Sequence, residues 1–243
     1  MTISSSQAAS AQVIISYEGL DRSAGEDLYG TVQLSFNGNT GNADYVDLGL
    51  QAAIGVRGDA ASGHWLRLYP SYRLRRSEGA NVVHERSAHL RHSYVLSDAL
   101  STFSFVQIQA DESLDLDRRL LIGGGLRRRL IRLDEGGLEV GIGVMVENEL
   151  LDSGATRTDL RGANLVAVQG TAGTVGLSVT GFFQPVLSEF GDHRVSLLAS
   201  ATVPVSSQLE VGVSGYWRRD SRPPLNVEAD DAGIRFVLRF SAD

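Results

Sequence analysis

Three histidines and one glutamate lie close together in the sequence, and these residue types can bind a metal ion or transfer protons. They are His84, Glu85, His89 and His92. In an extended strand, alternate side chains point to opposite faces. His89 and His92 then lie on different faces, and a shared site would need a bulge. The spacing therefore favours packing in a polar interior and at an interface over a metal or catalytic site.

An acidic group follows in the chain, and carboxylates are the ligands that Ca²⁺ prefers. Its members are Asp111, Glu112, Asp115 and Asp117. The glycine spacing of an EF-hand loop is absent. We interpret the group as a solvated acidic loop, with divalent bridging to lipopolysaccharide as the alternative.

Two further patterns suggest chemistry only weakly. The triplet Gly123–Gly125 resembles a phosphate loop, but no Lys-Ser/Thr follows it and it lies within an alternating stretch. Glycines inside a strand more often mark a bend or a close approach of two backbones. Ser93 directly follows His92, so the two side chains point to opposite faces and do not form a nucleophile–base pair.

The largest constellation is a set of charged residues that share one face of the predicted strands. With Asp47, they form a predicted lumen charge network, which either lines a selective pore or fills the barrel with salt bridges. The network comprises Arg67, Arg73, Arg75, Arg91, Arg119, Arg127, Arg129, Glu139, Glu147, Glu149, Glu210, Arg218, Arg235 and Arg239.

The elements that would position these residues are long alternating strands. Between Leu138 and Glu149 apolar and polar or glycine residues alternate, which indicates a β-strand with one apolar face. This length is close to the roughly 9–11 residues that a strand needs to cross a bilayer. We predict twelve strands, over residues 29–36, 46–56, 64–76, 84–96, 99–111, 117–131, 137–150, about 158–170, 175–183, 195–203, 209–217 and 234–240. In the fifth strand, alternation alone does not decide which face points inward.

Composition agrees with one all-β domain in 243 residues. There is no apolar run long enough for a transmembrane helix and no cysteine, and the net charge of −7 argues against nucleic acid as a partner. All 22 basic residues are arginine, which pairs with carboxylates in crowded interiors better than lysine does. A GC-rich genome explains the same bias.

The links between strands indicate a membrane barrel. Counted from a periplasmic N-terminus, one end has short turns such as SDA and TAG, and the other has longer links such as LSEFGD and RRDSRPPLNVEAD. Outer-membrane barrels have this asymmetry and an even number of strands. Residues 1–28 are interpreted as a signal-peptide remnant and periplasmic linker, and residues 29–243 as the barrel. We expect an export signal that this sequence does not contain.

The segments LRHSY, FVQIQAD, RRLLIGGGLR and LEVGIGVMVENE, with the SFNGNTGNAD hairpin, resemble one known family. The chain is similar, over about residues 11–243, to domain of unknown function 481, a group described as salt-induced outer membrane proteins. The resemblance implies an outer-membrane barrel and carries over no catalytic residue.

We therefore predict an all-β protein, a twelve-stranded antiparallel up-and-down transmembrane β-barrel in a Gram-negative outer membrane. The expected function is that of an integral envelope protein, either a narrow passive pore or a salt-bridged barrel, without enzymatic activity, cofactor or metal. The expected partners are outer-membrane lipid, lipopolysaccharide and the barrel-assembly machinery. The alternatives are an outer-membrane lipid-modifying enzyme and a soluble β-barrel that binds an apolar ligand.

Two structural predictions follow from the pattern. Aromatic residues favour the bilayer interface, so Trp65, Tyr94 and Phe240 are expected at the periplasmic rim and Phe36, Phe183 and Trp217 at the outer rim. In the hairpin of the sixth and seventh strands, Arg129 should oppose Glu139 and Arg119 should oppose Glu149. Arg128, on the lipid side, is expected near the periplasmic rim.

Overall fold

The computed structural model describes residues 28–39, 45–58, 63–77, 83–133, 136–223 and 228–242. Residues 1–27, most of the predicted N-terminal segment, lie outside them. The strands are β1 (Leu28–Asn39), β2 (Tyr45–Arg57), β3 (His64–Ser77), β4 (Val83–Ser97), β5 (Leu100–Asp111), β6 (Leu116–Leu133), β7 (Gly136–Leu151), β8 (Thr156–Gly162), β9 (Asn164–Ala172), β10 (Val175–Val186), β11 (Glu189–Pro204), β12 (Leu209–Asp220) and β13 (Asp230–Ala242). A short 3₁₀ helix, η1 (Glu112–Leu114), links β5 to β6. Within the described ranges, no helix is long and apolar enough to span a membrane.

The sheet closes on itself. Strands that follow one another along the chain pair antiparallel, except β8 and β9, and β1 pairs with both β2 and β13. β8 and β9 keep one register with β7 and with β10 on both sides of Ala163, so they are two halves of a single strand. The chain is therefore the predicted closed, all-antiparallel barrel of 12 strands. We call the end at which β1 begins and β13 ends the terminal end, and the opposite one the far end.

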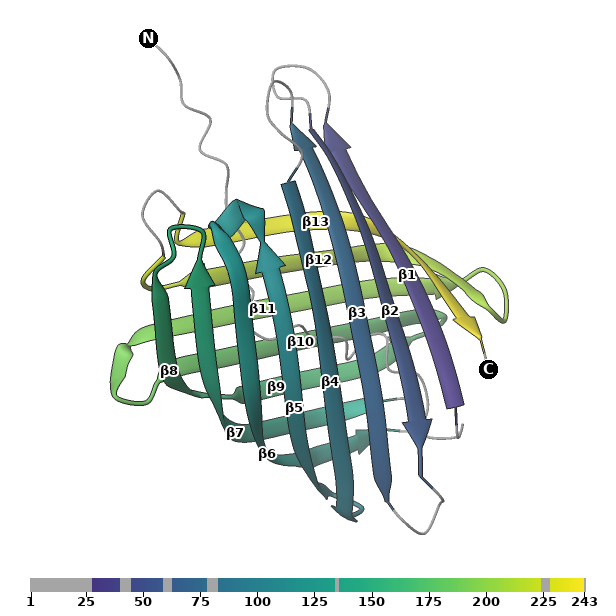
Figure 1. Ribbon diagram of the computed structural model, residues 1–243. Helices are drawn as coiled ribbons and strands as arrows, with labels where there is room; N and C mark the ends of the chain where they lie inside the picture. Colours follow the sequence, from purple (N-terminus) through teal and green to yellow (C-terminus); the bar gives the residue numbers. More distant parts are fainter. Residues whose placement is uncertain are drawn as a thin grey trace.

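The two walls of the barrel cross at a steep angle (Figure 1). β1 to β5 run along one wall, and β10 to β13 cross behind them, while β6 and β7 curve from one wall towards the other. Side chains from β1–β3 and from β10–β13 line a common cavity, so the interior between these walls is narrow.

The faces are inverted relative to a water-soluble protein. Apolar side chains on the outer face are exposed, as for Ile122 (53%) and Ile142 (68%). The most deeply buried side chains include Arg161, Gln107 and Glu147. An apolar outside and a polar inside are what a lipid-embedded barrel requires. This arrangement argues against the alternative of a soluble β-barrel that binds an apolar ligand.

One part of the interior is nevertheless apolar. Phe103 and Phe105 point inward, whereas Val106 and Ile108 are 44% and 49% exposed on the outer face, which settles the orientation of β5. The two rings belong to a buried cluster on the inner side of β5, β6, β7, β9 and β10. Its members are Phe103, Phe105, Leu121, Met145, Ala163, Leu165, Ala167 and Phe182.

The predicted hairpin register is confirmed. Arg119 lies opposite Glu149 and Arg129 opposite Glu139. The pairing then shifts by one residue between Arg129 and Ile131, so a bulge precedes the turn. Arg128 is exposed and lies opposite Leu100, the first residue of β5, which places it near the terminal end.

The aromatic prediction is wrong for Trp65. Tyr94, Phe240, Phe36, Phe183 and Trp217 are exposed on the outer face near the expected strand ends. Trp65 instead points inward, where it packs with Tyr29, Ala53 and Tyr69. The reason is that alternate residues of a strand face opposite sides. Because Leu66 and Leu68 face outward, Trp65 points into the lumen.

The predicted loop asymmetry is also partly wrong. β11 begins at Glu189, six residues before the expected start at Val195, so only Leu187 and Ser188 join β10 to β11. The longest far-end link, residues 221–229 between β12 and β13, remains. The strands extend because Asp192 and Arg194 point inward and are held by ion pairs there.

Glycines on β6 and β7 allow these two backbones to approach closely, as the alternating glycines suggested. A Cβ atom at Gly125 would lie 2.1 Å from the carbonyl oxygen of Ile142, and one at Gly143 would lie 2.4 Å from that of Gly124. Both obstacles are backbone atoms, which side-chain rotation does not relieve.

Replacing Gly125 by alanine should therefore destabilise the barrel by about 1–3 kcal/mol, the usual range for overpacking. The matched control is Gly30→Ala, since a Cβ at Gly30 meets nothing within 4 Å. Urea unfolding in detergent, followed by gel mobility without boiling, compares the two variants. Equal midpoints for both would contradict the close-approach explanation.

Candidate functional site: the charged lumen

The structure brings all fourteen predicted network residues to the inner side of the wall. Arg91, Arg119, Glu147, Glu149, Arg218 and Arg239 are buried there. The others are partly exposed to the lumen, and their contacts divide the network into a far-end part, a central part and a terminal-end part.

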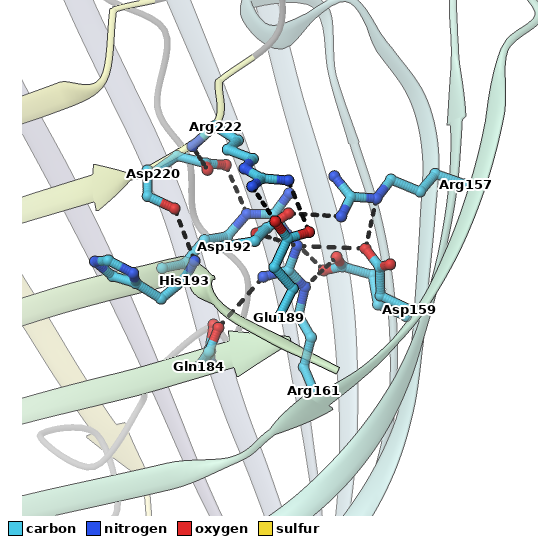
Figure 2. Close-up of polar contacts among 12 residues, drawn as sticks. Arg157, Asp159, Arg161, Gln184, Glu189, Asp192, His193, Asp220 and Arg222 are labelled. Carbon is cyan, nitrogen blue, oxygen red and sulfur yellow. Dashed lines mark hydrogen bonds and ion pairs between the residues drawn. The ribbon is translucent and has the colours of Figure 1, made fainter. Parts of the chain in front are cut away.

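The far-end part centres on Arg161, which is fully buried (Figure 2). Its Nε donates to Glu147 at 2.8 Å, its Nη2 lies 3.1 Å from Asp192, and its Nη1 donates to the backbone carbonyl of Gln184 at 3.3 Å. Its Nη2 also lies 3.4 Å from Asp159. One guanidinium therefore connects β7, β8, β10 and β11.

Arg194 makes a second set of contacts across the same region. It donates to Glu147 at 2.6 Å, to Glu149 at 3.0 Å and to Asp220 at 2.6 Å. Arg119 donates to Glu149 at 2.6 Å. We call the following residues the far-end network: Arg119, Glu147, Glu149, Arg157, Asp159, Arg161, Asp192, Arg194 and Asp220.

The central part surrounds Tyr216. Three guanidiniums lie near this ring, with Arg235 at 4.4 Å, Arg218 at 4.7 Å and Arg73 at 5.9 Å from the centroid. Arg73 donates to Asp47 at 2.8 Å and to Glu85 at 3.2 Å. A cation over an aromatic face is favoured electrostatically, so the ring supplements the carboxylates.

At the terminal end the pairs are simpler. Glu139 forms ion pairs with Arg127 at 3.4 Å and with Arg129 at 3.1 Å. Glu210 forms an ion pair with Arg239 at 3.1 Å. The remaining predicted arginines are held as follows. Arg67 lies over Trp65, Arg91 lies over Tyr69, and Arg75 lies 3.7 Å from Asp47.

Two cavities lie in the lumen. The far cavity has a volume of about 280 Å³ and is lined by Arg119, Glu149, Arg194, Asp220 and residues of the far-end links. The central cavity has a volume of about 100 Å³ and is lined by Arg73, Glu85, Tyr216, Arg218, Arg235 and small hydroxyl residues. Along β12 the far cavity reaches Asp220 and the central cavity reaches Arg218, which are consecutive inward-facing residues, so the two cavities approach each other there.

The prediction missed six members of the far-end network, which are Arg157, Asp159, Arg161, Asp192, Arg194 and Asp220. It assigned no face to the eighth strand and began the tenth at Val195. Extending the alternation of Val195 and Leu197 backwards would have directed Arg194 and Asp192 inward.

The other sequence candidates do not assemble into sites. His89 points inward and lies 3.0 Å from Gln107, whereas His92 and His84 lie on the outer face, against His64 and Tyr72. Within the described parts of the chain, no group of three or more His, Cys, Asp or Glu residues is placed to hold a metal ion. In the acidic loop, Asp111 accepts from the backbone of Ser113, and Glu112 accepts from that of His84, so their carboxylates turn apart.

A closed antiparallel barrel with an apolar outside and a charged lumen defines an outer-membrane β-barrel. The chain belongs to the family described as protein of unknown function, DUF481, whose family model matches residues 32–241. No curated protein matches the chain.

Solved structures similar to the chain are outer-membrane barrels of very different sequence. The NanC porin is 8% identical, with a TM-score of 0.53, covering 87% of this chain and 98% of that one. The KdgM porin is 9% identical, with a TM-score of 0.46 and coverages of 89% and 98%. LpxR from Salmonella typhimurium is 10% identical, with a TM-score of 0.44 and coverages of 88% and 99%. At this identity the likeness to the NanC porin shows the fold alone.

Replacing Arg194 by methionine should destabilise the barrel by about 3–5 kcal/mol, because it leaves buried carboxylates without a counter-charge. The matched control is Arg129→Met, whose side chain is 38% exposed and whose partner Glu139 keeps Arg127. That exposed pair should cost below about 1 kcal/mol. Urea midpoints measured in the same detergent compare the variants, and a larger loss at Arg129 would contradict the assignment.

Proposed function

We propose that the barrel is a narrow passive pathway through the outer membrane for water and small ions, with the far-end network as its constriction. The observation that carries this proposal is the pair of cavities that approach each other along β12, where Asp220 pairs with Arg194. A cavity needs roughly 10–15 Å³ of such volume for one water molecule. The central cavity therefore holds several waters and excludes larger solutes.

The arrangement of ion pairs supports passage rather than a fixed plug. Glu147 contacts three arginines, and Arg194 contacts three carboxylates. A group with several partners can exchange one contact without leaving a bare buried charge. The apolar cluster favours the second candidate, a sealed salt-bridged barrel without transport, because it fills the lumen beside β5 to β7.

We propose no catalytic role. The histidines point to different faces of the wall, as described above, and His92 contacts His64 on the outer face, away from the lumen. The charged residues of the far-end network are engaged with one another in ion pairs.

Purified protein in planar bilayers should show small unitary currents in KCl. Ser200→Phe places a ring in the central cavity and should reduce the unitary conductance several-fold, because Ser200 lines it. Ser104→Phe, exposed on the outer face, is the matched control and should leave the conductance unchanged. A wild-type protein that never conducts would favour the sealed barrel. Equal currents in all three proteins would place the pathway elsewhere.

We also propose that the terminal end faces the periplasm, as in bacterial outer-membrane barrels. The chain contains no cysteine, so single cysteines report on orientation. Ser153→Cys, in the β7–β8 link at the far end, should react with an impermeant maleimide on intact cells. Thr174→Cys, in the β9–β10 turn at the terminal end, should react only after the outer membrane is opened. The reverse pattern would overturn this orientation.

A further inference from the structure

Four of the exposed arginines at the far end differ in their partners. Arg219 pairs with Asp230 at 2.7 Å, and Arg222 pairs with Glu189. Arg86 and Arg118, on β4 and β6, are also exposed, but no acidic side chain among the described residues pairs with either. Arg118 makes only a long hydrogen bond, at 3.4 Å, to Asn148.

These two arginines flank Ala110 on the outer face. Arg86 lies opposite Ala110 of β5. On the other side of β5, Gln109 pairs with Arg119 of β6. The next residue of β5, Ala110, is therefore beside Arg118, and it lies between the two arginines. Two strand spacings place their backbones about 10 Å apart, within reach of two arginine side chains that converge on one group. The short side chain of alanine does not separate the two guanidiniums.

Arg86 and Arg118 lie at the edge of the apolar band, where a lipid headgroup would lie. Towards the terminal end, the next outward residues on β4, β5 and β6 include Leu90, Ile108 and Ile122, which are 41%, 49% and 53% exposed and form the apolar band. Arginine on the lipid face costs roughly 2–4 kcal/mol at the midplane and about 0–1 kcal/mol near the interface. Arg86 lies three residues from the start of β4 and Arg118 two residues from the start of β6, where the band ends.

We infer that Arg86 and Arg118 form a binding site for the phosphate of a phosphorylated glycolipid in the outer leaflet. Guanidinium binds phosphate through paired hydrogen bonds, and the apolar band below accommodates acyl chains. Tyr72, which lies opposite Arg86 and whose hydroxyl hydrogen-bonds His84, adds a polar neighbour for a sugar. Asp117, the bulge residue beside Arg118, is exposed but forms no ion pair with it within the described chain. This inference rests on the proposed orientation and not on conduction.

The test uses the full chain in phosphatidylcholine nanodiscs that contain diphosphorylated lipid A, with bound lipid counted by native mass spectrometry. The variant R86Q/R118Q should bind lipid A at least ten-fold more weakly than wild type. The control R219Q alters an exposed far-end arginine that already has an acidic partner, and it should bind as wild type. Gel mobility without boiling verifies that each variant is folded.

Two further lipids decide the chemistry. Lipid A without phosphates should bind wild type and R86Q/R118Q equally weakly, and phosphatidylglycerol should bind wild type at least ten-fold more weakly than lipid A. Equal binding of lipid A by wild type and R86Q/R118Q would overturn the site. Equal affinity for phosphatidylglycerol would overturn the glycolipid assignment. The cysteine labelling described above separates a wrong orientation from a wrong site, and the bilayer currents bear only on the pathway.

Discussion

The structure depends on one constraint, that a backbone in lipid has no hydrogen-bond partner except another part of the protein. An open sheet would leave an edge of bare N–H and C=O groups, each costing several kcal/mol. The pairing of β1 with β13, from Gly30 with Ala242 to Phe36 with Phe236, removes that edge. Closure then fixes the side chains, because alternate residues must face lipid and the remainder must share the lumen. The apolar outside and the polar inside are therefore two consequences of the same closed pattern of backbone hydrogen bonds.

Filling the lumen with charge creates a second requirement, that each buried charge has a partner. Arginine meets it well, since one guanidinium offers five donors and can serve several carboxylates. Arg161 contacts acceptor atoms of four residues, and Arg194 contacts the carboxylates of three. Such pairs add little net stability, because desolvation offsets much of the attraction. Their larger effect is to fix the register of the strands, because a slip by one residue would move Arg119 and Glu149 into lipid.

The alternation of apolar residues was enough to predict the strand number, the closure and the opposition of Arg119 and Arg129 to their glutamates. It failed where a local feature interrupts the alternation, and where an aromatic residue lies on the same face of a strand as charged residues. Trp65 was assigned to the interface by residue type, although its neighbours Leu66 and Leu68 fix it inside. The far-end network was incomplete because its members come from five strands that are distant in sequence. Their meeting depends on how the walls cross, which no local pattern encodes.

The interior is narrow for two different physical reasons, and only one of them is compatible with passage. On the side of β5 to β7, Phe103, Phe105 and Phe182 fill the space with apolar contacts that offer nothing to a hydrated ion. On the other side, the central cavity is lined by serines, Tyr216 and guanidiniums that can replace part of a hydration shell. On the proposed pathway a solute would follow the polar side, where carboxylates and guanidiniums line both cavities. Charge and size, rather than the shape of a larger ligand, are the properties that such a lumen can discriminate.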